Sequence, residues 1–239
     1  MDMTQLAVVG IVTVAGFVRG TTGFGGAMLM SPILSVLIGP VPAVVTALLL
    51  ETGAALVMFP DAIPKARWST LLYLTLPAVI TVPIGGYLLL TLDPSIARKL
   101  ISAVVIVFST MLLFGLRYTG SPRIVTSLAL GSVVGALLGA TSVGAPPVIL
   151  YLLSGPDPAT VTRANLTIFV TAISVIGLVM LAAAGAITAK LALSALALTV
   201  PFLVATWLGG KFFARLSDNN VRRFALGLML SVGVASLFL

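Results

Sequence analysis

The feature that most constrains this chain is an apolar stretch at residues 6–38 with a polar, glycine-rich interruption at its centre. The interruption reads GFVRGTTGFGG at residues 16–26 and contains five glycines, two threonines and an arginine. As one straight helix the stretch would be about 50 Å long, whereas the hydrocarbon core of a bilayer is about 30 Å thick. Glycine permits left-handed and tightly turned backbone, so several glycines together indicate a break. We therefore predict two half-helices, at roughly 6–18 and 27–38, that meet inside the membrane.

A second interrupted stretch, at residues 124–153, follows the same plan. Ser142 replaces Gly23 in it, and a pair of prolines lies just after the break. Four further residues stand 119 positions after their counterparts: Gly135, Gly139, Thr141 and Gly144 match Gly16, Gly20, Thr22 and Gly25. Two interrupted hydrophobic segments at corresponding positions of two halves indicate the binding site of a secondary transporter.

The composition is that of a membrane protein. Of the 239 residues, 59% are hydrophobic and 8% are charged, against about 25% charged in a typical soluble domain. Successive apolar runs of 18 or more residues predict an all-α polytopic protein embedded in a lipid bilayer. The net charge of +7 is explained by basic residues in short loops, where they set topology and meet anionic lipid, so we expect no nucleic-acid partner.

The chain contains no cysteine and no histidine. This removes disulfides, thiol and imidazole metal ligands, and histidine-based catalysis. The glycine-rich run also lacks the Gly-Lys-Ser/Thr ending of a nucleotide-binding loop. We therefore expect no metal, no cofactor and no enzymatic activity.

We expect two homologous halves, at residues 1–118 and 119–239, each with one broken or re-entrant segment and three transmembrane helices. In the first half these are residues 6–38, 43–59, 69–92 and 98–116, and in the second 124–153, 159–184, 189–210 and 221–239. Six matches at a spacing of 124 support a duplication: Thr75, Pro77, Gly85, Gly86, Leu92 and Arg98 match Thr199, Pro201, Gly209, Gly210, Leu216 and Arg222.

Two topologies remain open. If each broken segment crosses the membrane fully, the halves are parallel and the loop Lys and Arg residues divide seven to five between the two faces. If each is a hairpin that returns from the midplane, the halves are inverted and the division is nine to three. Basic residues concentrate in cytoplasmic loops. We therefore favour the inverted repeat over the parallel one, with both termini on the periplasmic side.

Arg19 lies at the first break, where an unpaired arginine costs about 3 kcal/mol on insertion scales. Its partner is an anionic substrate, the backbone carbonyls freed at the break, or Glu51, the one carboxylate at depth. Glu51 has two open roles: it gains and loses a proton in a transport cycle, or it only neutralises Arg19. We assign Arg163 to topology, with a funnel that guides anions as the alternative.

Helix N-termini at the two breaks would present free N–H groups and a positive dipole end to an anion. Hydroxyl groups near the breaks add donors, and glycines let the backbone approach a ligand. The spaced pairs Gly16/Gly20 and Gly135/Gly139 we attribute to close helix packing instead. The candidate substrate-binding residues are Arg19, Thr21, Thr22, Gly23, Gly25, Gly26, Thr141, Ser142, Gly144 and Asn165.

The motif G-x-x-x-G-x-x-G-x-G-G at residues 16–26, followed by Pro32 and a proline-containing turn in a short duplicated membrane protein, resembles the TauE/SafE family. These are sulfite and organosulfonate exporters of the 4-toluene sulfonate uptake permease family. The resemblance implies a multi-pass protein of the bacterial inner (plasma) membrane whose substrate is sulfite, sulfoacetate or a related sulfur-containing anion. We expect a secondary transporter, with protons as a candidate coupling ion. The alternatives are an anion channel and a non-transporting membrane subunit of a complex.

Overall fold

The computed structural model describes residues 3–116, 118, 123–153, 155, 157–213 and 218–239. The described part of the chain is helical, with ten α-helices and one short 3-10 helix. Seven of the described helices are long and apolar enough to cross a membrane. The all-helical membrane fold expected from the apolar runs is confirmed.

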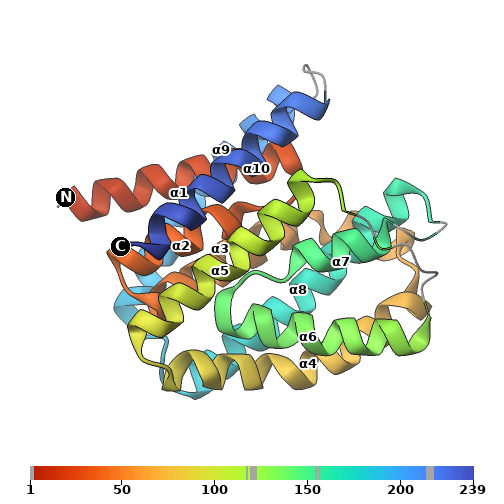
Figure 1. The fold of residues 1–239 in the computed structure, drawn as a ribbon, viewed down its shortest axis with the longest axis horizontal. Coiled ribbons are helices and arrows are strands. Elements are labelled where there is room, and N and C mark those ends of the chain that lie inside the picture. The colour runs from red at the N-terminus through yellow and green to blue at the C-terminus, as the bar shows by residue number, and fades with distance from the viewer. Residues whose placement is uncertain (1–2, 117, 119–122, 154, 156, 214–217) are drawn as a thin grey trace.

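The elements follow each other with short connections (Figure 1). Up to residue 116 they are α1 (Met3–Thr22), α2 (Gly26–Leu37), α3 (Pro40–Ala62), η1 (Ile63–Lys65), α4 (Trp68–Thr91) and α5 (Pro94–Leu113). After residue 122 they are α6 (Ile124–Thr141), α7 (Ala145–Leu152), α8 (Ala159–Ala183), α9 (Ala189–Phe213) and α10 (Asp218–Leu237). The chain thus leaves the helical conformation once in each interrupted stretch.

The arms of the breaks are unequal, which corrects the expectation of two half-helices. Helix α1 has 20 residues and continues to Thr22, four residues past the expected end. Helices α2 and α7 have only 12 and 8 residues. At 1.5 Å per residue α1 is about 30 Å long, close to a full bilayer core, while α2 and α7 are about 18 and 12 Å long.

Glycines allow two pairs of helices to pack backbone against backbone. Gly20 of α1 lies against the carbonyl of Thr206 in α9, and Gly139 of α6 lies against the carbonyl of Val82 in α4; a Cβ at either glycine would overlap that oxygen. This close packing offsets the low helix propensity of glycine. It explains why α1 continues through Gly16 and Gly20, and why the packing interpretation of these glycines holds.

The two contacts correspond to each other in sequence. Gly139 stands 119 positions after Gly20, and Thr206 stands 124 positions after Val82. The two contacts are therefore made by equivalent residues of the two halves. Helix α1 packs on α9 in one contact, and α6 packs on α4 in the other. In both pairs the helices run in the same direction.

Each interrupted stretch folds back on itself. The start of α1 and the end of α2 line one cavity, which contains Gln5, Val8 and Ile38. In the second stretch the hydroxyl of Tyr151, near the end of α7, lies 2.6 Å from the hydroxyl of Ser127, near the start of α6. Both stretches are therefore helical hairpins.

Two other helix pairs run antiparallel. In α5 and α10, Ser102 Oγ lies 2.7 Å from Ser236 Oγ, and Ile106 lies against Gly233. In α3 and α8, Leu48 lies against Gly177, and the end of α3 meets the start of α8. Helices α2, α3 and α8 lie between the α1–α9 pair and the α4–α6 pair (Figure 1). Both termini lie at one end of the molecule.

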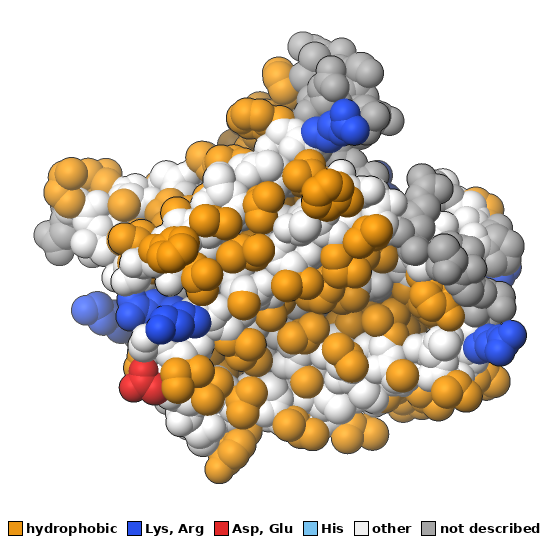
Figure 2. Space-filling view, viewed as in Figure 1, with side chains coloured by type: hydrophobic (Ala, Val, Ile, Leu, Met, Phe, Trp, Pro, Cys, Tyr) orange, Lys and Arg blue, Asp and Glu red, His pale blue; other side chains and the backbone are white. Residues whose placement is uncertain are grey.

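The outer surface is apolar, as lipid requires. Apolar side chains cover the face seen in Figure 2, and basic side chains gather near its ends. On α4 the exposed side chains recur every fourth residue, at Leu72, Leu76, Ile80 and Ile84. This spacing places them on one side of the helix, facing away from α6.

Candidate functional site

The two breaks meet at one central cavity of about 50 Å³. It is lined by Gly23, Phe24 and Gly25 from the first break and by Ser142 and Val143 from the second. Helices α3 and α8 complete the walls. Segments that lie more than a hundred residues apart in the sequence therefore form one site.

The two breaks share a local geometry. Thr22 Oγ1 donates to the carbonyl of Val18 at 2.8 Å and accepts from the N–H of Phe24 at 3.3 Å. Thr141 Oγ1 donates to the carbonyl of Leu137 at 2.6 Å and accepts from the N–H of Val143 at 3.2 Å. Each threonine thus ends its helix by binding the local backbone. These hydroxyls shape the break and do not line the cavity.

The residue after each threonine adopts left-handed backbone, with φ of 79° at Gly23 and 60° at Ser142. For a residue with a Cβ this conformation costs about 1–2 kcal/mol. Ser142 is the one non-glycine residue with positive φ in the described chain. Its hydroxyl lies 2.7 Å from that of Ser31 in α2, so it ties the second break to the first hairpin.

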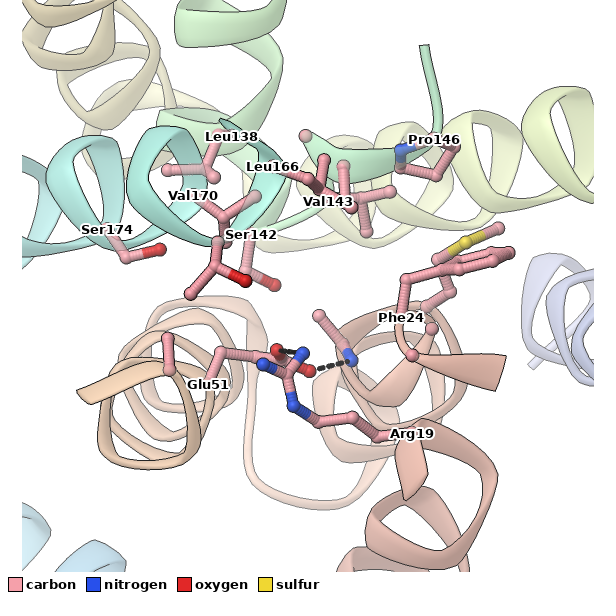
Figure 3. A pocket seen from close by; sticks show the side chains of 18 of the residues that line it. Arg19, Phe24, Glu51, Leu138, Ser142, Val143, Pro146, Leu166, Val170 and Ser174 are labelled. Carbon is pink, nitrogen blue, oxygen red and sulfur yellow. Dashed lines mark hydrogen bonds and ion pairs between the residues drawn. The ribbon is translucent and has the colours of Figure 1, made fainter. Parts of the chain in front are cut away.

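Glu51 of α3 binds the positive groups at the first break (Figure 3). Its Oε2 forms an ion pair with the guanidinium of Arg19, and its Oε1 accepts from the N–H of Ala27, in the first turn of α2, at 3.0 Å. The Glu51 side chain is 7% exposed and that of Arg19 is 11% exposed. Of the three partners left open for Arg19, the structure has Glu51. Its carboxylate occupies the place at the helix N-terminus that we expected for an anion.

Arg163 of α8 also lines the central cavity, on the side of the glycine at position 23. Together with Met58 and Thr167 it also lines a second cavity of about 510 Å³ between the end of α3 and the start of α8. The second cavity therefore leads to the site, and Arg163 lies at the junction. It makes no ion pair or hydrogen bond through its side chain within the described residues.

This position favours a role in guiding anions, the alternative to topology that the sequence left open for Arg163.

The model of one known family, the sulfite exporter TauE/SafE, matches residues 8–236 of this chain. The chain belongs to the TauE/SafE family. No curated protein and no solved structure matches it significantly. Family membership and the seven apolar helices identify a multi-pass membrane protein of a sulfite and organosulfonate exporter family.

The expected substrate-binding residues of this TauE/SafE protein fall into two groups. The cavity is lined by Arg19, Gly23, Gly25, Ser142 and Gly144, and by Glu51. Five others lie outside its lining: Thr21, Thr22, Gly26, Thr141 and Asn165. The buried Thr21 donates to the carbonyl of Val18 at 2.9 Å, and Asn165 Oδ1 accepts from the N–H of Arg67 at 2.8 Å. The first hydrogen bond holds local backbone, and the second joins α8 to the backbone just before α4.

The second helix N-terminus differs from the first. Pro146 and Pro147 occupy the first turn of α7, and proline has no N–H to donate. The α2 terminus is therefore the richer source of backbone donors. In the described part of the family member's chain no group of three His, Cys, Asp or Glu side chains is placed to hold a metal.

Sequence reasoning missed Ser174 of α8, which lines the cavity. It is 1% exposed, and its hydroxyl has no hydrogen-bond partner within the described chain. Buried hydroxyl groups are nearly always hydrogen-bonded. An occupant of the cavity is a natural partner for it.

Proposed function

We propose that this TauE/SafE protein is a secondary transporter that exports a small sulfur-containing anion, sulfite or an organosulfonate such as sulfoacetate, across the bacterial inner membrane. One observation carries the proposal: two broken hairpins from distant parts of the chain meet at a cavity that also contains Arg19, Arg163 and the N-terminus of α2. Broken helices of this kind form the substrate sites of transporters at the bilayer midplane.

The donors suit an oxyanion. A guanidinium offers parallel N–H groups that match two oxygens of one anion, and the α2 N-terminus adds backbone N–H groups and its dipole. The cavity measures about 50 Å³, whereas one water molecule needs about 10–15 Å³ on this scale. A compact oxyanion such as sulfite fits this space, and the tail of a larger sulfonate would extend past Arg163 into the second cavity.

We propose that the halves, residues 1–118 and 119–239, form an inverted repeat. Two observations support this. The equivalent helices α3 and α8 run antiparallel to each other, and so do α5 and α10. The contact of α1 with α9 is also repeated by the contact of α6 with α4. Equivalent helices that run antiparallel are related by an axis in the membrane plane. Such repeats support alternating access by rocking around a fixed site.

The path from the site to one face is, in this proposal, the second cavity, which lies between the end of α3 and the start of α8. Toward the other end of this helix pair Leu48 packs onto Gly177. In an inverted repeat the open end and the closed end exchange between the two states of the transport cycle. Separation of Leu48 from Gly177 would therefore open the site to the other face. Because the loop Lys and Arg residues favour the face opposite the termini nine to three, we propose that the termini are periplasmic and the open face is cytoplasmic.

A binding screen tests the function directly. Purified protein is heated with sulfite, sulfoacetate, methanesulfonate, sulfate or carboxylates, and a ligand at 100 times its Kd should stabilise the protein by about 2.7 kcal/mol. Proteoliposomes should then take up radiolabelled ligand with saturable kinetics. Conductance far above carrier rates would indicate a channel instead. The proposal fails if no sulfur-containing anion binds or moves.

A further inference from the structure

We propose that Glu51 is a built-in competitor of the transported anion, so that the anion binds Arg19 and the α2 N-terminus only when Glu51 takes up a proton. The inference rests on the proposed transport of an anion and adds its coupling ion. It starts from one fact: the carboxylate of Glu51 already holds the two positive groups at the break.

The contacts of Glu51 are those of a ligand. One oxygen pairs with the Arg19 guanidinium and the other accepts from the N–H of Ala27 at 3.0 Å. A carboxylate and a sulfonate or sulfite both offer two oxygens to such a pair of donors. A Cβ at Gly26 would lie 2.5 Å from Oε1, so the carboxylate lies directly against the first turn of α2. An anion that binds these same two donors must therefore displace the carboxylate from them.

The charges around Glu51 give the exchange its proton dependence. The charged groups that line the cavity within the described chain are Glu51 itself on α3, Arg19 on α1 and Arg163 on α8. Further along α3 and η1, Asp61 and Lys65 line the neighbouring cavity. Helix α2 contributes backbone N–H groups.

An incoming anion would share one guanidinium with an ionised Glu51 and be repelled by it. A proton on the Glu51 carboxylate removes that negative charge, so Arg19 is free to pair with the anion. The balance is one proton taken up for each anion bound. When the anion leaves, Glu51 releases the proton and pairs with Arg19 again, so a monoanion leaves together with one proton and its export is driven by its own concentration gradient.

The cavity also contains a group that an occupant would satisfy. Ser174 Oγ is buried and has no partner within the described chain, and it lines the same cavity as Glu51 and Arg19 (Figure 3). While Glu51 holds Arg19, this hydroxyl remains unsatisfied. An anion in the cavity accepts a hydrogen bond from it.

The decisive measurement is proton uptake on binding. Wild-type protein in weakly buffered solution with a pH indicator is titrated with methanesulfonate, whose sulfonate stays ionised throughout. We expect about one proton taken up per anion bound, and an apparent affinity that falls about tenfold per pH unit once Glu51 is ionised in the free protein. Binding without proton uptake would overturn the inference while leaving the transport proposal intact.

Glu51→Gln is the variant and Asp93→Asn its control, because Asp93 caps α5 away from both cavities and asparagine is an equally good N-cap. E51Q should bind methanesulfonate with no proton uptake and with a pH-independent affinity at or above the best wild-type value. D93N should behave as wild type. If E51Q keeps the wild-type pH slope, another group takes the proton.

The wild-type measurement decides the inference even where a variant fails to fold. If neither wild type nor E51Q is stabilised by sulfite, methanesulfonate or sulfoacetate, both proposals fall. If E51Q binds these anions and wild type does so only at low pH, both are supported.

Discussion

Breaking the Arg19–Glu51 pair should destabilise the protein strongly unless both partners are removed together. Both side chains are nearly buried, and Glu51 also accepts from the backbone N–H of Ala27. Removing one partner of a buried pair leaves an uncompensated charge and costs about 3–5 kcal/mol. Arg19→Met should therefore lower the free energy of unfolding by about that amount.

The double variant Arg19→Met/Glu51→Gln is the control. It leaves no unpaired charge, and its amide oxygen still accepts from Ala27, so it should recover most of the lost stability. Unfolding in detergent by a chemical denaturant, followed by helix content, gives the free energies of wild type, R19M, E51Q and the double variant. These four values give the coupling between the two sites. An R19M variant as stable as wild type, or a double variant as unstable as R19M, would refute the assignment of a buried pair.

Three further predictions follow from the contacts. Gly20→Val should push α1 from the backbone of α9 and prevent stable folding, whereas Gly10→Ala, which has open space around its Cβ, should raise stability by up to about 1 kcal/mol in thermal unfolding. Ser142→Gly should be more stable than Ser142→Ala by about 1 kcal/mol, because both lose the bond to Ser31 and only glycine relieves the left-handed backbone; equal melting temperatures would contradict this. Arg163→Ala should leave stability within about 0.5 kcal/mol of wild type, since the residue is exposed. The same variant should raise the concentration for half-maximal uptake in proteoliposomes, and Lys99→Ala, on exposed surface away from the cavity, should leave it unchanged.

The broken helices are predictable because they arise from local backbone preference. Clustered glycines at residues 23–26 end α1 and begin α2 wherever the rest of the chain lies. The length of the first arm is not predictable in this way. Gly16 and Gly20 stay helical because α9 packs against them, and nothing near them in the sequence shows that contact.

The hydroxyl groups at the breaks show how local backbone competes with a ligand. Thr22 and Thr141 were expected to bind a ligand, but a hydroxyl close to a helix end first satisfies the backbone beside it. Arg163 was left out of the candidate site because its position near a loop favoured a role in topology over one in guiding anions. Its place at the cavity depends on α8 running antiparallel to α3, which is decided by packing between helices more than a hundred residues apart.

By itself the sequence determined the membrane environment, the helical class and the position of both breaks, because hydrophobic run length and glycine content act within a few residues. Only the tertiary structure decided that Arg19 meets Glu51, that both breaks open on one cavity, and that Arg163 stands at its entrance. Charges and hydroxyl groups choose their partners by distance in space. That distance is set by how the helices pack.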